Sequence, residues 1–388
     1  MKDQRRRLAS ILNLHDFERA ARRHLPRPIF GYVANAAEDG KTLDTNRQAF
    51  DDYCFLPRAL VDVSRVSLDT ELFGKCYDAP FGIAPMGISA LSAYRGDKVL
   101  AQAAAKANIP MIMSGTSLIP MEDVAGPEGT DWFQAYLPGD REGIEALIAR
   151  IEKAGFKNLV ITVDYPVPPN SENNVRSGFS SPLRPSLRLA LDGLLRPRWL
   201  VGTFVKTLLH HGMPHFENNY ATRGVPIISK HVNRDFSGRS HLSWEHLALV
   251  RSLWTGRLVV KGILHPQDAV RARSAGVDGI IVSNHGGRQL DGTVAPMRAL
   301  PSIVQAVEDL PVMIDSGFRR GSDVLKALGL GARFVFIGRP FNYAAAYAGK
   351  AGVAHAIHLL SDEISRNTAL LGITRTAEMS QAHLCRNC

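Results

Sequence analysis

The stretch Gly279–Gly292 contains the residues of this chain whose types and spacing are best suited to chemistry. It begins with aliphatic residues that lack helical periodicity, which predicts a buried strand, and then changes abruptly to Ser-Asn-His-Gly-Gly-Arg. In α/β barrels and doubly wound sheets, reactive side chains lie where a parallel strand ends and its loop begins. His285 can accept a proton near neutral pH, and Arg288 offers a planar fork that suits a carboxylate or a phosphate. A lone histidine after a strand is usually structural, so the whole string indicates the site.

A regular alternation of strands and helices must position these residues, and it begins near residue 80. Apolar runs of strand length recur eight times, at Phe81–Ala84, Met111–Met113, Trp132–Tyr136, Leu159–Val163, Leu258–Lys261, Gly279–Val282, Val312–Ile314 and Phe334–Ile337. Helical patterns separate most of them, at Asp97–Ala107, Arg141–Ala154, Pro266–Ala275, Ser302–Glu308 and Ser322–Leu328. Eight such units predict an α/β fold, a TIM (β/α)8 barrel rather than an open sheet.

We expect one domain over residues 1–388, with N-terminal helices and a hairpin over 1–79 and the barrel over 80–388. A helix is predicted to start near Asn13, and a second helix to cover Ile29–Asp39. The segment Val61–Tyr77 predicts a hairpin with its turn at Phe73-Gly74-Lys75.

Polar or small residues recur at the ends of the predicted strands. They are Pro85, Met86 and Gly87 after the first strand, Ser114, Gln134 and Tyr136, Thr162 and Asp164, Lys261, and Ser283 with His285. Because strand ends meet at one face of a barrel, we expect these side chains to lie together. Buried polar groups need partners, and the edge of a heteroaromatic ring would supply many of them. For each residue alone, an ordinary hydrogen-bonded role in the barrel is the alternative.

A phosphate-binding pattern follows late in the chain. Asp315-Ser316-Gly317-Phe318-Arg319 leads into a helix, and Gly338-Arg339 follows the eighth strand. The loops after strands seven and eight form the usual phosphate site of such barrels, built from backbone N–H groups and a helix N-terminus. Arg319 and Arg339 would complement the charge of a dianion.

The string Ser-Asn-His-Gly-Gly-Arg-Gln-Leu-Asp, which starts at Ser283, closely resembles the active-site signature of the FMN-dependent 2-hydroxy-acid oxidases and dehydrogenases. The similarity extends from about Tyr32 to about Leu371 and weakens between Pro166 and His241. It implies a barrel that binds FMN and oxidises a 2-hydroxy acid such as lactate or mandelate. By the same resemblance, the glycines and arginines of the two late loops hold the FMN phosphate.

The resemblance also implies roles for individual residues. His285 would be the base, and Asp164 would hold its imidazole and stabilise the cation, as in a catalytic triad. Tyr136 would hydrogen-bond the substrate oxygen, while Tyr32 and Arg288 would face the substrate carboxylate. Lys261 would favour the anionic reduced flavin by its charge. A homo-oligomer, by resemblance a tetramer, is expected.

Two positions bear on the substrate and on the electron acceptor. Family members usually carry a second carboxylate-binding arginine after the fourth strand, where this chain has Ser171. Arg176 could replace it, or the substrate could be larger, esterified or a modified peptide end. At Gly87 this chain resembles the dehydrogenases of the family, which tend to have glycine at this position, whereas the oxidases often have alanine. It favours a quinone or another acceptor over oxygen, and an oxidase remains the alternative.

The predicted connection between the fourth and fifth strands, residues 165–242, is far longer than an ordinary loop. Its centre, 187–200, combines Arg188, Arg196 and Arg198 with Leu187, Leu189, Leu191, Leu194, Leu195 and Trp199. This composition suits an anionic membrane surface. A helix packed on the barrel rim, or on a neighbouring subunit, is the alternative.

Composition limits the remaining readings. The 388 residues carry a net charge of +9, which would suit nucleic acid, an anionic membrane or an anionic ligand; no RNA-binding or helix-turn-helix pattern favours nucleic acid. Four cysteines make no disulfide framework, which indicates a reducing compartment. Cys385 and Cys388 are expected in a frayed tail, and no metal site is predicted.

Without a signal-peptide run or a stretch long enough to span a membrane, we expect a cytoplasmic protein, with peripheral association with the inner face of the membrane left open. Two other classes also remain open. One is an isomerase or synthase barrel that uses FMN or a sugar phosphate. The other is a basic binding protein on an inactive barrel.

Overall fold

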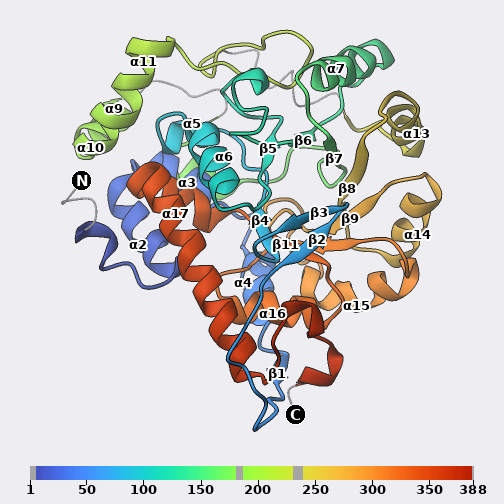
Figure 1. Cartoon of the computed structure of the whole chain (residues 1–388). Helices are drawn as coiled ribbons and strands as arrows, with labels where there is room; N and C mark the ends of the chain where they lie inside the picture. Colours follow the sequence, from blue (N-terminus) through green and yellow to red (C-terminus); the bar gives the residue numbers. More distant parts are fainter. Residues whose placement is uncertain (1–5, 181–186, 230–238, 387–388) are drawn as a thin grey trace.

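The computed structural model describes residues 6–180, 187–229 and 239–386. Its centre is a parallel eight-stranded barrel (Figure 1). The strands follow the order β4-β11-β10-β9-β8-β7-β6-β5, and a parallel bridge between Ile83 and Met111 joins the two end strands. The bounds are β4 Phe81–Ile83, β5 Ile112–Ser114, β6 Trp132–Ala135, β7 Asn158–Thr162, β8 Arg257–Ile263, β9 Gly279–Val282, β10 Val312–Ile314 and β11 Phe334–Ile337. The predicted TIM barrel is confirmed.

The inside of the barrel is a packed apolar core. Its inward side chains include Trp132, Met313, Phe334 and Phe336. The hairpin of β2 (Thr70–Leu72) and β3 (Lys75–Tyr77) covers the amino-terminal end, where Trp132 Nε1 donates a hydrogen bond to Tyr77 Oη at 3.3 Å. Since this end is plugged, a ligand site has to lie at the carboxyl end of the strands.

The hairpin is shorter than the sequence suggested. It starts at Thr70 rather than near Val61. Phe73 and Gly74 form its turn with φ of 55° and 79°, the left-handed pair that suits the twist of a two-residue hairpin.

Helices surround the barrel. Those of the barrel are α5 Ser89–Ser92, α6 Gly96–Lys106, α7 Arg141–Lys153, α13 Trp244–Leu253, α14 Pro266–Ser274, α15 Pro296–Val307, α16 Gly321–Gly329 and α17 Arg339–Leu370, with 3₁₀ turns at Met121–Asp123, Thr376–Glu378 and Gln381–His383. The long helix α17 is kinked, because Ala348 and Gly349 leave the helical region.

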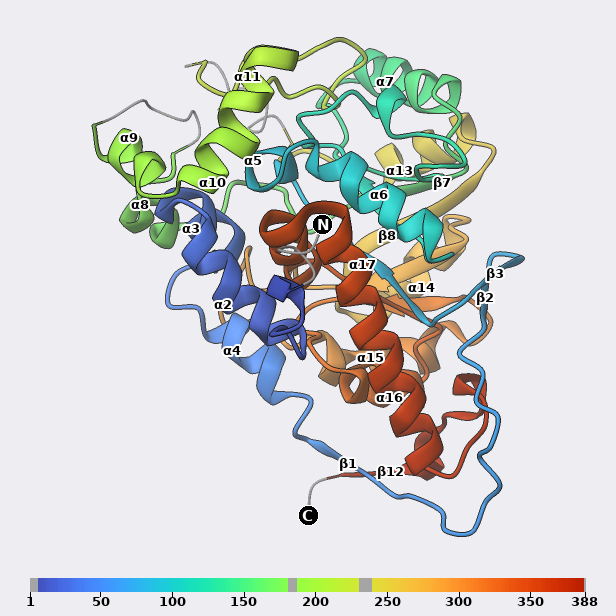
Figure 2. The same ribbon diagram turned by 60° about the vertical axis from the view of Figure 1, so that its left-hand side comes forward.

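The N-terminal segment contributes α2 Leu14–His24, α3 Arg27–Ala34 and α4 Lys41–Gln48. Helix α2 starts where predicted, because Asn13 Oδ1 accepts hydrogen bonds from the backbone of His15 and Asp16. It packs along α17, as Figure 2 shows. The predicted helix Ile29–Asp39 is wrong at its end: α3 stops at Ala34, and the chain continues as a loop toward the carboxyl end of the barrel.

The prediction of a frayed tail is wrong for Cys385. This residue lies in strand β12, Leu384–Arg386, which pairs antiparallel with β1, Tyr53–Phe55, and sits opposite Cys54. A strand partner more than 300 residues away cannot be read from local composition. Cys388 lies outside the described residues.

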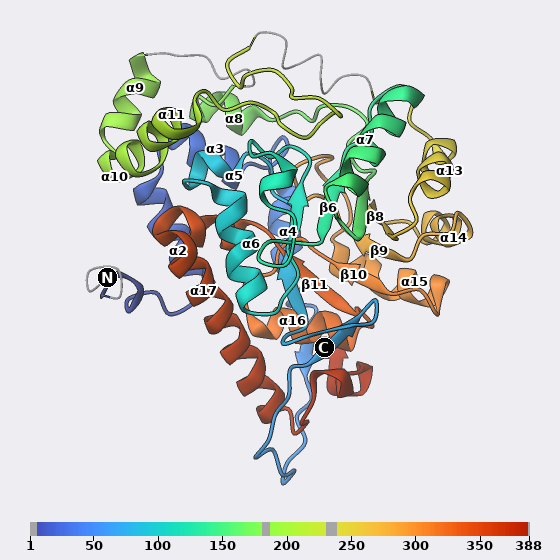
Figure 3. The ribbon, with the colours of Figure 1, turned by 45° about the horizontal axis from the view of Figure 1, so that its top comes forward.

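The insertion after β7 contains α8 Glu172–Ser177, α9 Leu187–Leu194 and a continuous helical run from α10 Pro197–Trp199 through a π-helical segment Leu200–Val205 to α11 Lys206–His211. These helices lie together beside the N-terminal helices, away from α13 and α14 (Figure 3). Trp199 was expected at an exposed surface, but it is 6% exposed and Nε1 donates to Leu91 O at 2.7 Å. In the described part of the chain, no helix is long and apolar enough to cross a membrane.

Candidate active site

His285 lies directly beyond the carboxyl end of β9, and its backbone has a φ of 58°. The backbone N–H donates to Ser283 Oγ at 3.0 Å. Gly287 follows with φ of 77°, and a Cβ there would lie 2.7 Å from the backbone nitrogen of Leu43. The glycine thus lets the loop that carries His285 fold tightly against the first turn of α4.

The imidazole lies between a carboxylate and a phenol. His285 Nδ1 is 2.9 Å from Asp164 Oδ1, and Nε2 is 3.4 Å from Tyr136 Oη. An ionised carboxylate only accepts hydrogen bonds, so Nδ1 carries a proton and Nε2 keeps its lone pair in the neutral ring. Burial alone would raise the pKa of Asp164, but His285 and Lys261 outweigh it and lower that pKa. The geometry therefore supplies a base at Nε2 and a fixed negative charge behind it.

Lys261 lies on β8, between β7 and β9, the strands that Asp164 and His285 follow. Its Nζ donates to Ser283 Oγ at 2.9 Å and lies 3.4 Å from Asp315 Oδ2 and 4.0 Å from Asp164 Oδ2. Burial would lower the pKa of this lysine, but the two carboxylates raise it above the ordinary value. A buried, fully protonated ammonium group thus stands at the centre of the barrel mouth.

The barrel mouth opens into a cavity that is lined by His285 and Lys261 at one end. Two buried arginines line its other end. Arg339 donates to the backbone carbonyls of Val33, Asn35 and Gly286, and Arg319 donates to Phe318 O. Neither makes an ion pair within the described residues. Burial lowers the pKa of both, for Arg339 to about 9. Two buried cations without an anion are costly, so this end of the cavity suits a bound phosphate.

Several buried polar atoms between these two ends have no hydrogen-bond partner among the residues that the structure describes. They are Gln134 Nε2 and Thr162 Oγ1 on the strands, and Asn342 Oδ1 in the first turn of α17. All three residues line the cavity. A heteroaromatic ring with donors and acceptors on its edge would satisfy such atoms. Together with the two arginines, these residues fit FMN, the group that the resemblance implies.

The structure brings the residues selected from the sequence together. All the predicted catalytic and cofactor-binding residues line this cavity except Asp164 and Ser283, which contact His285 and Lys261. An outer cavity shares Tyr32, Tyr136, His285 and Arg288 with it and opens toward the insertion.

The outer cavity contains residues that the sequence analysis missed. Its wall includes Tyr165, Phe179, Ile227 and Arg239. Tyr165 packs on Tyr136 with ring centroids 5.6 Å apart. All four lie in the insertion, where the resemblance is weakest, and no local motif marks them.

The position of the expected second arginine is occupied by a small polar residue. Ser171 Oγ accepts a hydrogen bond from Asn35 Nδ2 at 3.2 Å. Arg176, the suggested replacement, has a side chain that is 72% exposed and pairs with Glu172. It is a solvent-facing residue at the rim, since its charge is already neutralised and hydrated there.

Comparison with known proteins gives a consistent result. A family profile described as FMN-dependent dehydrogenase matches residues 21–386. The (S)-mandelate dehydrogenase of Pseudomonas putida is 37% identical over 376 residues, which cover 97% of this chain and 94% of the relative. The L-lactate dehydrogenase of Stenotrophomonas maltophilia is 40% identical over 380 residues, 95% of this chain and 97% of the relative.

Solved structures agree with the sequence matches. A structure described as the monotopic membrane protein (S)-mandelate dehydrogenase superposes with a TM-score of 0.90, at 36% identity, and covers 97% of this chain and 100% of its own. A mandelate oxidase structure superposes with a TM-score of 0.80, at 32% identity, over 97% and 99% of the two chains.

Proposed function

Since the chain belongs to the FMN-dependent dehydrogenase family, and is therefore an FMN-dependent 2-hydroxy-acid dehydrogenase or oxidase, we propose that it oxidises a 2-hydroxy acid related to lactate or mandelate to the 2-oxo acid, with His285 as the base. One observation carries the proposal: His285 Nε2 faces the cavity mouth while Nδ1 is held 2.9 Å from Asp164. A neutral imidazole with its lone pair directed at a cavity is the arrangement that proton abstraction needs.

The side chains around the cavity have distinct roles in the proposed reaction. His285 Nε2 takes a proton from the substrate, and Asp164 stabilises the imidazolium that forms. Tyr136 Oη, at 3.4 Å from Nε2, donates to the substrate oxygen; burial and Asp164 raise the pKa of this phenol, so it stays protonated. Arg288, whose guanidinium lies 4.9 Å from the ring centre of Tyr32, binds the carboxylate together with the Tyr32 hydroxyl.

The cofactor would be held by Gln134, Thr162 and Lys261 at the strand ends and by Arg319 and Arg339 at the phosphate end. When bound, FMN supplies the two-electron acceptor. Lys261 stays protonated between Asp315 and Asp164 and would supply positive charge to the bound cofactor.

The outer cavity favours a substrate larger than lactate. Its wall presents the rings of Tyr165 and Phe179 and the side chain of Ile227, a surface suited to an aromatic or long apolar side chain. The relatives named for (S)-mandelate support the same size class. A larger or modified hydroxy acid remains the second candidate, because Ser171 leaves more room and less charge than an arginine would.

We also propose a quinone or protein as electron acceptor, a homo-oligomer, and contact of the insertion with an anionic membrane. Exposed apolar side chains on α9 and α11, among them Leu187 and Leu209 at 86% and 77% exposure, support the membrane contact. The description of the solved relative as a monotopic membrane protein supports it as well.

An anaerobic absorbance experiment tests the function. The purified protein should be yellow, and its visible bands should bleach when (S)-mandelate, L-lactate or a longer 2-hydroxy acid is added. Bleaching should be fastest with a bulky side chain. A flavin that is bound but stays oxidised with every 2-hydroxy acid, including larger ones, would refute the proposed reaction while leaving FMN binding intact.

A further inference from the structure

We propose that Arg239 is the second cation of the substrate site and binds a carboxylate of the substrate opposite Arg288. This inference rests on the proposed function and names how the site recognises negative charge without the arginine that Ser171 replaces. Arg239 comes from the end of the insertion after β7.

Arg239 is placed at the reacting end of the outer cavity. It is 4% exposed, its Nε donates to Leu137 O at 3.2 Å, and its Cζ lies 4.9 Å from the ring centre of Tyr136. The hydroxyl of the same tyrosine is 3.4 Å from the base, His285 Nε2. One aromatic ring therefore separates the guanidinium from the reaction centre.

The other arginines on the wall of the outer cavity are placed differently from Arg239. Among its described residues the arginines are Arg176, Arg239 and Arg288. Arg176 is exposed and paired with Glu172. Arg288 Nη1 donates hydrogen bonds to the carbonyls of Tyr32 and Val33. The remaining N–H groups of this guanidinium can therefore contact one side of a carboxylate.

The charge of Arg239 acts on the tyrosines that surround the substrate. Burial raises the pKa of Tyr165, and the positive charges of Arg239 and Arg288 oppose that shift. Both arginines thus project their fields onto the same phenol, from different elements. An anion placed between them would be attracted by each, in a site where burial strengthens the attraction.

A purely structural role of Arg239 predicts a different effect of its replacement on the kinetics. Arg239 could act only by stacking on Tyr136 and tying the insertion to Leu137. Its loss would then disturb Tyr136 and slow the chemical step for every substrate, charged or not. A substrate-binding role predicts instead that binding of anions weakens, while the rate at saturation changes less.

The experiment compares Arg239→Met and Arg239→Lys with Arg176→Met, an exposed arginine of the same cavity. The probe is oxalate, an unreactive dicarboxylate, titrated against the FMN-loaded protein and followed by flavin absorbance. Arg239→Met should weaken oxalate binding about tenfold or more, Arg239→Lys should weaken it less, and Arg176→Met should leave it within twofold.

A rescue keeps the test meaningful if Arg239→Met also disturbs Tyr136. The double variant Arg239→Met/Ser171→Arg returns a cation to the outer cavity, and we expect it to recover oxalate affinity at least in part. Unchanged oxalate affinity in Arg239→Met would overturn the inference. An equal loss of binding affinity for oxalate and for an uncharged hydroxy-ester would overturn it as well.

Substrate kinetics identify which carboxylate is bound. If Arg239 holds the reacting carboxylate, Arg239→Met raises KM for mandelate and for malate alike. If it holds a carboxylate on the substrate side chain, KM rises for malate only. KM unchanged for both acids contradicts the proposal. Failure of the proposed function would look different, because the wild-type flavin would then stay oxidised with both acids while oxalate binding still reports on Arg239.

Discussion

Asp164 Oδ1 lies 2.9 Å from His285 Nδ1, although the two residues are 121 positions apart in the chain. They follow β7 and β9, and the strand between these two, β8, carries Lys261. The order of strands in the barrel thus places a carboxylate, an ammonium and an imidazole side by side, and the carboxylate faces both the ammonium of Lys261 and the neutral imidazole of His285.

The first prediction concerns this pair. His285→Ala should keep FMN bound and slow anaerobic flavin reduction by ~10²–10⁴-fold or more, because the base is lost. Asp164→Asn should also slow reduction, since an amide cannot stabilise the imidazolium. Stopped-flow absorbance with saturating substrate measures both. His265→Ala, a histidine that caps α14, is the control, and reduction of His285→Ala at the wild-type rate would show that another group is the base.

The second prediction concerns the phosphate end. Arg339→Met should weaken FMN binding by about tenfold or more, because a buried charge-assisted contact is lost. The pKa of Arg339 is lowered by burial to about 9, so FMN should also dissociate more readily above that pH. Fluorescence of released flavin measures both effects. Arg333→Met changes an exposed arginine near the plugged end of the barrel and should retain FMN fully; equal retention by both variants would contradict the assignment.

Much of this arrangement could be predicted because it is local. The strands are short apolar runs with both faces buried, and the motifs at Ser283–Asp291 and Gly338–Arg339 are continuous in sequence. What could not be predicted depends on contacts between distant segments. Trp199 is buried because Leu91 and Phe204 are there to receive it, and Arg239 reaches Tyr136 through a long insertion without a motif.

The third prediction concerns the electron acceptor. A Cβ at Gly87 would overlap Thr116 Oγ1 and lie 3.3 Å from the Tyr32 hydroxyl, so Gly87→Ala must shift the loop next to the cofactor cavity. We expect the wild-type enzyme to turn over faster with a quinone analogue than with oxygen, and Gly87→Ala to move that ratio toward oxygen. Oxygen uptake and quinone reduction, measured on one preparation, give the ratio. Equal wild-type rates with the two acceptors would refute the expectation.

The fourth prediction concerns a buried carboxyl group away from the site. Burial raises the pKa of Asp97, in the first turn of α6, to about 6, above an unfolded value of about 3.9. A raised carboxyl pKa gives stability that is present below the unfolded pKa and lost as pH rises through the folded one.

Asp97→Asn removes the free-energy cost of ionising a buried carboxyl group. The gain in free energy of unfolding should therefore be larger at pH 8 than at pH 5, by roughly 1 kcal/mol. Urea denaturation at both pH values measures it. Asp268→Asn, an exposed aspartate in the first turn of α14, should show no such difference, and a gain for Asp97→Asn that does not depend on pH would contradict the buried-carboxyl explanation.

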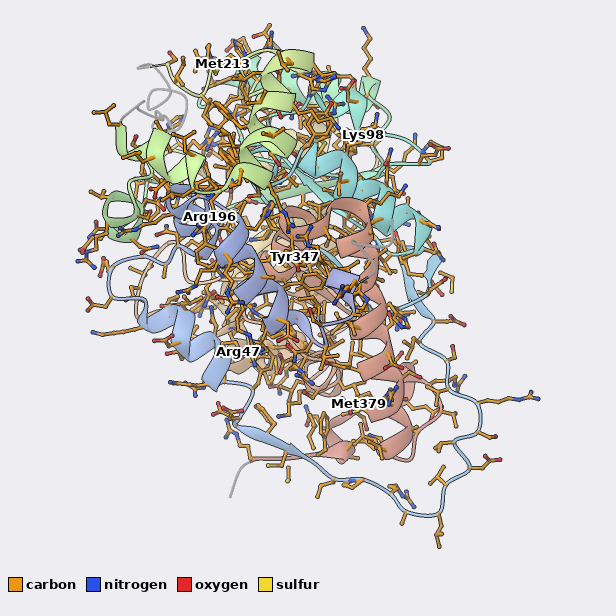
Figure 4. The ribbon with its side chains drawn as sticks, turned by 90° about the vertical axis from the view of Figure 1, so that its left-hand side faces the viewer. Arg47, Lys98, Arg196, Met213, Tyr347 and Met379 are labelled. Carbon is orange, nitrogen blue, oxygen red and sulfur yellow. The ribbon has the colours of Figure 1, made fainter. Side chains whose placement is uncertain are left out.

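The last prediction concerns the insertion surface. Leu191, Leu194 and Leu195 are exposed on and after α9, and Arg196 lies where this surface meets the N-terminal helices, with Nε 3.3 Å from Leu25 O (Figure 4). Exposed leucines next to basic residues favour an anionic bilayer, through apolar burial and through attraction of about 1 kcal/mol per basic residue. Trp199 takes no part, because it is already buried in the fold.

Changing the three leucines to serine should weaken sedimentation with anionic vesicles at least tenfold, since each buried leucine contributes about 1.5–3 kcal/mol. High salt should release only part of the wild-type protein, because it screens the charges and leaves the apolar contact. The matched control changes Leu12, Leu60 and Leu370, three exposed leucines elsewhere, to serine. Equal sedimentation of the two triple variants would reject the membrane contact and leave the α9 surface for a neighbouring subunit, which light scattering of the same two variants would then reveal as a change in mass.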